Sequence, residues 1–247
     1  MSILRALSWL VLPLLVGRAV AGPPPLWSGN SGGFHVTITA DSLVAADRRG
    51  RAVFELKSTV EEPREGVPSV SYVPLSLVGP YLSLESDLAQ SEEGAAHVQR
   101  SRDYITVDLR APGRPVALRD WWSEAELLSA LLADPYLSDR LKGAKARIAS
   151  LQTLADEIDR LNDCHLQLPE PTIRSFAFHR RIDSTRVAVR VGLANSCIQD
   201  EIIQLGIVLP IPAALASDLA EAAASRRGFL MNASRRLFGE SFSIGPR

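Results

Sequence analysis

The sequence predicts an α+β fold in which a mostly antiparallel sheet packs with two to three helices. In the first half of the chain, apolar and polar residues alternate in short segments that are typical of half-buried strands. Apolar residues at three- and four-residue steps follow, as in amphipathic helices. Strand-like segments then return before an alanine-rich helix. This grouping of strands and helices favours α+β over a regular β-α alternation.

The amino end resembles a secretory signal peptide. Arg5 gives it a positive start, residues 7–16 are largely apolar, and an Ala-Val-Ala cleavage site occupies residues 19–21. The apolar run is shorter than the about 20 residues that a membrane span needs. We therefore expect residues 1–21 to be removed and the product to be secreted or periplasmic; the alternative is an uncleaved anchor.

The next segment, residues 22–33, is rich in Pro, Gly and Ser and is predicted to be a flexible leader. Residues 34–247 should form the α+β domain, with a boundary near residues 144–170 if there are two subdomains. Residues 29–33 formally fit GxSxG. A nucleophile elbow needs a helix after the serine, whereas a strand is expected here, so we expect no catalytic serine.

Period-two alternation locates the strands of the first half. A bend is expected where Gly79 meets Pro80, and the polar residues 87–100 are predicted to form a loop. The expected strands cover residues 34–40, 52–57, 69–85 (as one or two strands) and 104–109.

Two helices are expected in the middle of the chain. Ser123 and Glu126 form a capping box, in which each side chain bonds the other's free backbone N–H. The helix that they open carries an apolar stripe at residues 127, 128, 131 and 132. A second amphipathic pattern predicts a helix over residues 145–162.

The carboxyl-terminal third returns to strands. Residues 175–179 and 185–193 are predicted to flank a polar turn, and residues 201–211 form a buried strand that ends at prolines. An alanine-rich helix is expected over residues 213–226. The basic tail from Arg227 is expected to end loosely.

The charge balance excludes one class of partner. The chain has 27 basic and 28 acidic residues and a net charge of -1, which gives no electrostatic basis for binding nucleic acid. After the signal, no segment is apolar for long enough to span a bilayer. We also find no motif that points to a cofactor.

The two cysteines, Cys164 and Cys197, predict one disulfide, because an even pair in an oxidising compartment tends to be bonded. Two buried free thiols are the alternative, and half of a metal site is a third reading because His165 follows Cys164. No second ligand pair at metal-binding spacing accompanies them, so we expect no metal.

Few residues stand out as candidates for function. His97 lies in a polar segment, and Trp121 with Trp122 could stack on a sugar ring, although such pairs are more often part of a core. A hydrolase would need His97 together with a carboxylate such as Asp108 or Asp120.

Three segments together carry a family resemblance: residues 69–87, 93–122 and 204–219. The chain resembles the extracytoplasmic domain of unknown function that forms the carboxyl-terminal part of the lysozyme-sensing anti-sigma factor and accompanies some envelope polysaccharide deacetylases. The residues that match its motifs are Gly94, Ala96 and His97 in a loop, Asp108 and Leu109 at a strand end, Gly113 in a turn, and Leu118 and Asp120 before a helix. Ala95 and the tryptophan pair depart from the pattern.

The resemblance implies an α+β domain in an envelope setting, without the deacetylase chemistry. We therefore expect a non-catalytic binding domain for an envelope glycan or a muralytic protein such as lysozyme, acting through His97, Trp121 and Trp122. The alternatives are a structural or assembly protein of the envelope and, third, an envelope hydrolase.

Overall fold

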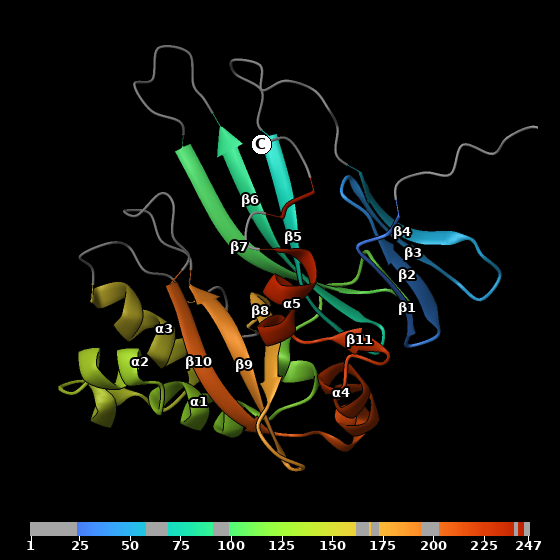
Figure 1. The fold of residues 1–247 in the computed structure, drawn as a ribbon. Helices are drawn as coiled ribbons and strands as arrows, with labels where there is room; N and C mark the ends of the chain where they lie inside the picture. Colours follow the sequence, from blue (N-terminus) through green and yellow to red (C-terminus); the bar gives the residue numbers. More distant parts are fainter. Residues whose placement is uncertain are drawn as a thin grey trace, which may run out of the picture.

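The computed structural model of the chain describes residues 24–57, 69–90, 99–161, 168, 173–193, 203–239 and 242–244 (Figure 1). It confirms the predicted α+β class. The described strands form three antiparallel sheets, and the described α-helices number five, which exceeds the two to three expected. None of these helices is both long enough and apolar enough to cross a membrane.

The first sheet has the order β1-β2-β3-β4. Its strands are β1 (Trp27–Ser31), β2 (Phe34–Ile38), β3 (Ser42–Ala46) and β4 (Ala52–Lys57). β1 corrects the expectation of a flexible leader, since residues 27–31 pair along their length with β2. Gly32 and Gly33, both at positive φ, close the two-residue hairpin between them. The sequence reading also missed β3.

The second sheet has the order β11-β5-β6-β7 and contains the longest strands. These are β5 (Ser69–Val78), β6 (Tyr81–Gln90) and β7 (Gln99–Asp108), with the short β11 (Gly228–Phe229) at the edge. The bend expected at Gly79 and Pro80 is the β5–β6 hairpin. The expected bounds of the loop, residues 87–100, are wrong at both ends, because strand pairing extends to Gln90 on β6 and Gln99 on β7.

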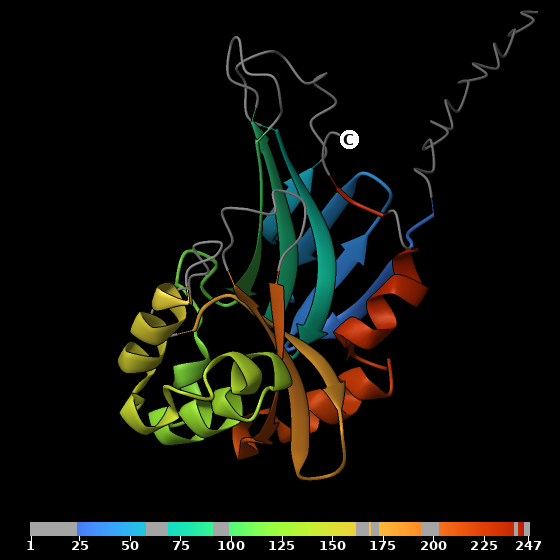
Figure 2. The same ribbon diagram turned by 90° about the vertical axis from the view of Figure 1, so that its left-hand side faces the viewer.

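The third sheet has the order β10-β9-β8. It consists of β8 (Phe176–Arg181), β9 (Arg186–Leu193) and β10 (Ile203–Pro210), close to the predicted strands. Figures 1 and 2 show helices α1 (Glu124–Leu132), α2 (Pro135–Arg140) and α3 (Leu151–Arg160) gathered beside this sheet.

Local sequence explains where these helices begin. The predicted capping box opens α1: the Glu126 N–H donates to Ser123 Oγ at 3.3 Å, and the Ser123 N–H donates to the Glu126 carboxylate at 2.9 Å. The helix expected over residues 145–162 is shorter. Its first residues form a 3-10 turn, and α3 begins anew where Ser150 Oγ accepts the Thr153 N–H.

The described part of the carboxyl-terminal tail, residues 227–239 and 242–244, is folded, which corrects a further expectation. The alanine-rich helix is α4 (Ala216–Ala223), and after it the chain forms β11 and then α5 (Met231–Phe238). Phe238, Phe242 and Ile244 are buried against the first two sheets. The basic residues of the tail therefore alternate with apolar anchors.

Two main cores hold the layers together. One lies between the helices α1–α3 and one face of β8–β10; Leu127 and Val189, on either side of the subdomain boundary suggested near residues 144–170, share it. The other lies between the sheets β1–β4 and β5–β7, where Val36 and Leu84 are fully or almost fully buried. The subdomain division stays a prediction.

Hydroxyl side chains join the second and third sheets. β8 has β9 on one side only, so its other edge presents backbone groups that need partners. Thr106 Oγ1 donates to the Phe176 carbonyl at 2.8 Å, and the Phe178 N–H donates to Ser76 Oγ at 3.3 Å. Ser83 supports Thr106 at 3.0 Å. These buried contacts fix β8 across the face of β5–β7.

Candidate functional site

The tryptophan pair belongs to the interior. Trp122 is 3% exposed, and its Nε1–H donates to the Pro210 carbonyl at 2.7 Å, which satisfies a backbone group at the outer edge of β10. The expectation that Trp122 contributes to a binding surface is therefore wrong. A ring that stacks on a ligand needs a free face, and this side chain has none.

Trp121 is half-buried and takes part in an aromatic cluster. Its ring lies edge-on to Tyr81 at 4.8 Å and also contacts Phe176 and Phe178. The planes of Trp121 and Trp122 meet at 76°. The pair is thus packed as internal aromatic contacts are, and it does not form the stacking platform that the sequence suggested.

The other predicted residues have different outcomes. His97, Cys164, Cys197 and the expected signal, residues 1–21, lie outside the described residues, so their roles stay predictions. The carboxylates proposed as partners of His97 are described, and each has a structural partner of its own.

Asp108 is buried and held by Arg110, whose Nε and Nη2 donate to it at 2.9 and 2.7 Å. Burial alone would raise the pKa of Asp108, but the hydrogen bonds from Arg110 outweigh it and keep the pKa below its usual range. Asp120 accepts the Ala117 N–H at 3.2 Å. Both carboxylates are thus engaged in structural contacts.

A different place carries the polar groups that a ligand could use. A cavity of about 360 Å³ lies between β5–β6 of the second sheet and the third sheet, and α5 forms one of its sides. That volume falls in the usual range for small-molecule sites, roughly 300–1,000 Å³. Its lining residues are Val73, Leu75, Glu85, His179, Arg190, Gln204, Met231, Asn232, Ser234, Arg235, Phe238 and Gly239.

Strand alternation puts the third sheet's polar residues into the cavity. Phe176 and Phe178 face the helices, so Ala177 and His179 face the opposite way, with an irregular register beside His179. On β9, Arg190 is the pairing partner of Ala177. One face of this sheet is thus apolar and packs in a core, and the opposite face carries His179 and Arg190.

Gly206 on β10 makes room for the arginine. It lies directly opposite Arg190, and a Cβ at this position would come within 2.5 Å of Arg190 Nη1. The Gly206 N–H, on the outer edge of β10, donates to Asp134 at 2.8 Å. The guanidinium therefore lies over a bare stretch of backbone.

The second sheet contributes a carboxyl group and a phenol. Glu85 and Tyr104 are direct partners on β6 and β7. Burial raises the pKa of Glu85, and the nearby Asp87 raises it further, against the opposing effects of Arg102 and Arg235. Burial, and then the charge of Glu85, also raise the pKa of Tyr104 well above its usual range.

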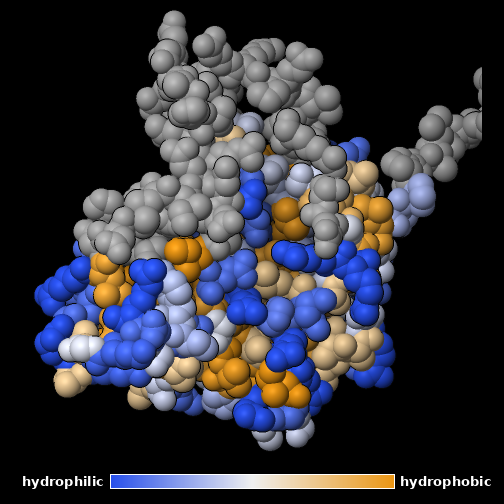
Figure 3. All heavy atoms as spheres, turned by 60° about the vertical axis from the view of Figure 1, so that its left-hand side comes forward, coloured by the Kyte–Doolittle hydropathy of each residue, from blue (hydrophilic) through white to orange (hydrophobic). Residues whose placement is uncertain are grey.

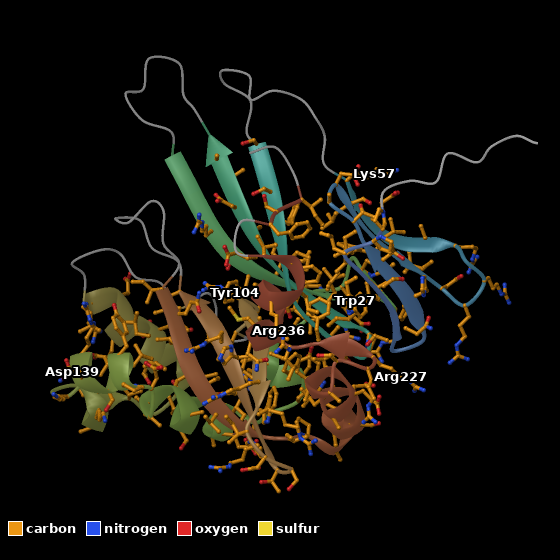
Figure 4. All side chains as sticks on the ribbon, viewed as in Figure 1. Trp27, Lys57, Tyr104, Asp139, Arg227 and Arg236 are labelled. Atoms are coloured by element: carbon orange, nitrogen blue, oxygen red, sulfur yellow. The ribbon has the colours of Figure 1, made fainter. Side chains whose placement is uncertain are left out.

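Tyr104 lies behind the cavity wall. It is 2% exposed and packs in a cluster with Leu75, Val73 and Met231, all of which line the cavity. Figure 4 places it toward the interior, near α5. Its hydroxyl is buried and has no hydrogen-bond partner among the described residues.

His179 has a similar unsatisfied atom. Its Nδ1 is buried and also lacks a partner within the described part of the chain. Burial lowers the pKa of His179, and the positive charges of Arg190 and Arg180 lower it further, so the imidazole is neutral at pH 7. A neutral imidazole can donate one hydrogen bond and accept another.

The cationic groups of the cavity form no close ion pair. In the described ranges, the ion pairs within 4.0 Å do not involve Arg190 or Arg235. Glu85 is the one acidic residue among those that line the cavity. The lining therefore carries more positive than negative charge.

The sequence reading missed this site because its members are far apart in the chain. A local signal was nevertheless present: His179 and Arg190 are polar residues within two strands that are otherwise strongly apolar. Among the described residues, no group of three or more His, Cys, Asp or Glu side chains is placed to hold a metal ion.

Comparison with known proteins identifies no relative. No family model matches the chain, and no curated protein or solved structure is similar to it. The function must therefore be argued from the geometry of the cavity itself.

Proposed function

We propose that this chain is a non-catalytic binding domain of the cell envelope, secreted or periplasmic, whose ligand occupies the cavity between the second and third sheets. The observation that carries the proposal is the convergence of Arg190, Arg235 and His179 on one cavity, in which neither arginine forms an ion pair among the described residues. A few convergent polar groups in a concave space are what orients a bound small molecule.

The cavity also has the mixed lining that ligand sites use. Val73, Leu75 and Phe238 give it an apolar part, while Glu85, Gln204 and the two arginines give it directional polar groups. Apolar walls with a few convergent polar groups are typical of small-molecule sites. An envelope glycan unit fits such a space, whereas a muralytic protein would have to insert a side chain or a loop. The envelope setting rests on the signal peptide and the family resemblance.

An assembly role is less well supported. Such a protein should expose a broad apolar patch. On the coloured surface of Figure 3, hydrophobic residues form small groups separated by hydrophilic ones. The most exposed large apolar side chains among the described residues are Leu26, Ile105, Ile182 and Val208. Of these, Ile182 and Val208 border one small hollow.

A hydrolase that uses this same cavity is the second candidate. Glu85 has a raised pKa and His179 a lowered one, and both line the cavity. Two titratable groups in one site whose pKa values are shifted in opposite directions can act as an acid and a base. Glu85 would then donate the proton and the neutral imidazole would accept one from water.

Calorimetric titration of the purified chain with soluble envelope glycan fragments, and separately with lysozyme, tests the proposal. Met231→Trp fills the cavity and should abolish binding, while Arg236→Trp, an exposed position on the same helix, should not. Equal binding by both variants would place the site elsewhere. Release of a cleaved product that depends on Glu85 would favour the hydrolase instead.

A further inference from the structure

We propose that the ligand of this cavity is a carboxylate with an apolar body, held between Arg190 and Arg235. This inference rests on the proposed binding function and specifies its ligand class. It is carried by two guanidinium groups that line one cavity without forming an ion pair among the described residues, and by the apolar side chains that line the same cavity.

The two arginines come from different elements. Arg190 projects from β9 and Arg235 from α5, and both line the same cavity. Neither forms an ion pair among the described residues, although Glu85 lines the cavity with them and the charge of Arg235 acts on the pKa of that carboxyl group. Guanidinium groups bind planar carboxylates through paired hydrogen bonds, which makes two such arginines in one cavity suited to an anion.

Apolar side chains define the rest of the ligand. Val73, Leu75, Met231 and Phe238 line the cavity beside the charged groups. A small inorganic anion would leave this part of the space unfilled. A carboxylate attached to a branched aliphatic or similar body would bury apolar area there.

A shallower hollow continues from the cavity along the third sheet. It measures about 150 Å³, shares His179 and Arg190 with the cavity, and reaches Ile182 and Val208. These last two are 36% and 46% exposed. The ligand can therefore extend beyond the cavity as a chain, with its carboxylate end at Arg190 and further apolar groups on the sheet.

Paired probes test the charge requirement directly. N-acetyl-leucine and its primary amide differ only in the carboxylate, and their affinities for the intact chain can be compared by ligand-observed NMR. The carboxylate should bind at least about tenfold more tightly, as expected for a charge-assisted hydrogen bond. Arg190→Gln and Arg235→Gln should each remove most of this difference, and Arg236→Gln should keep it. Thermal unfolding of each variant reports whether it is folded.

The outcomes separate this inference from the proposed function. Equal affinity for acid and amide, with both lost in Met231→Trp, would overturn the carboxylate inference but keep the cavity as a binding site. A preference for the acid that survives Met231→Trp would place the anion site elsewhere and overturn it too. Failure of both probes, while neutral glycan fragments bind and are lost in Met231→Trp, would contradict the inference and support the proposed function.

Discussion

Glu85 and Tyr104 face each other across the β6–β7 ladder, and the Tyr104 hydroxyl is buried without a hydrogen-bond partner among the described residues. A polar group in an interior is normally satisfied, because burial removes the water that would otherwise bond it. The position of this pair beside a cavity lined by Arg190 and Arg235 indicates that the region is built for a ligand rather than for stability.

The first prediction concerns Glu85. Burial raises the pKa of Glu85 in the folded state, whereas its pKa in the unfolded chain is close to the ordinary 4.5. The folded state therefore holds the proton more tightly than the unfolded state does. This contribution to stability is fully present below pH 4.5 and is lost as the pH rises through the folded pKa. Glu85→Gln should therefore be more stable than the native chain at pH 7, with the advantage shrinking toward pH 4. Urea unfolding at both pH values measures it, and a less stable variant at pH 7 would contradict the account.

The second prediction concerns His179, whose pKa lies below the ordinary 6.5 because of burial and two neighbouring arginines. As the pH falls through 6.5, the unfolded chain takes up a proton before the folded one does, so stability declines. His179→Gln should weaken this decline between pH 7 and pH 5. Comparison of urea midpoints across that window checks it. Parallel curves for the two proteins would mean that the imidazole is not buried as described.

The third prediction concerns the joint between the second and third sheets. Thr106→Val removes the hydroxyl that donates to the Phe176 carbonyl and leaves a buried acceptor unsatisfied. The expected loss is about 1–3 kcal/mol of unfolding free energy. Thr106→Ser keeps the hydroxyl and serves as the matched control. If Thr106→Val is as stable as the native chain while Thr106→Ser is not, the methyl group and not the hydrogen bond is what matters at this position.

The fourth prediction distinguishes a structural Trp122 from a ligand-binding one. Trp122→Phe keeps an aromatic ring but loses the donor to the Pro210 carbonyl. Stability should fall by about 1 kcal/mol or somewhat more, and ligand affinity should not change. Unfolding and titration on the same preparation measure both. Weakened binding without a loss of stability would restore the role suggested by the sequence.

The fifth prediction uses the absence of a side chain at residue 206. Gly206→Ala places a methyl group within 2.5 Å of Arg190 Nη1, and a flexible guanidinium yields by moving. Affinity for the ligand should decrease several-fold while the unfolding temperature changes little. Gly143→Ala, where a Cβ meets nothing within 4 Å, is the control. Unchanged affinity in Gly206→Ala would argue against a role for Arg190.

Local patterns predicted the fold well where the chain's own chemistry decides it. The capping box of Ser123 and Glu126 and the turn at Gly79 and Pro80 are short-range signals, and both are present as expected. β1 was missed because its sequence, WSGNS, has little strand propensity and is held by pairing with β2. α5 was missed because burial of Phe238 against other sheets, and not local pattern, decides its place.

The site is harder to predict because it exists only after the sheets pack. Glu85 and Arg190 belong to different sheets, and no spacing in the sequence links them. The tryptophan pair is a conspicuous local sequence motif, but in the folded protein it packs among apolar residues. A polar residue on one face of an otherwise apolar strand, as at His179, is the kind of signal that points to such sites.

The most direct test of the cavity as a binding site is the nuclear magnetic resonance signal of its histidine. The chain has four histidines, so selective labelling gives few signals, and His179→Gln assigns the one of interest. On titration with soluble envelope glycan fragments, the His179 resonance should shift to saturation with the same affinity that calorimetry reports, and that of His35, an exposed residue on β2, should stay in place. Calorimetric binding that leaves the His179 resonance unmoved would contradict the central claim.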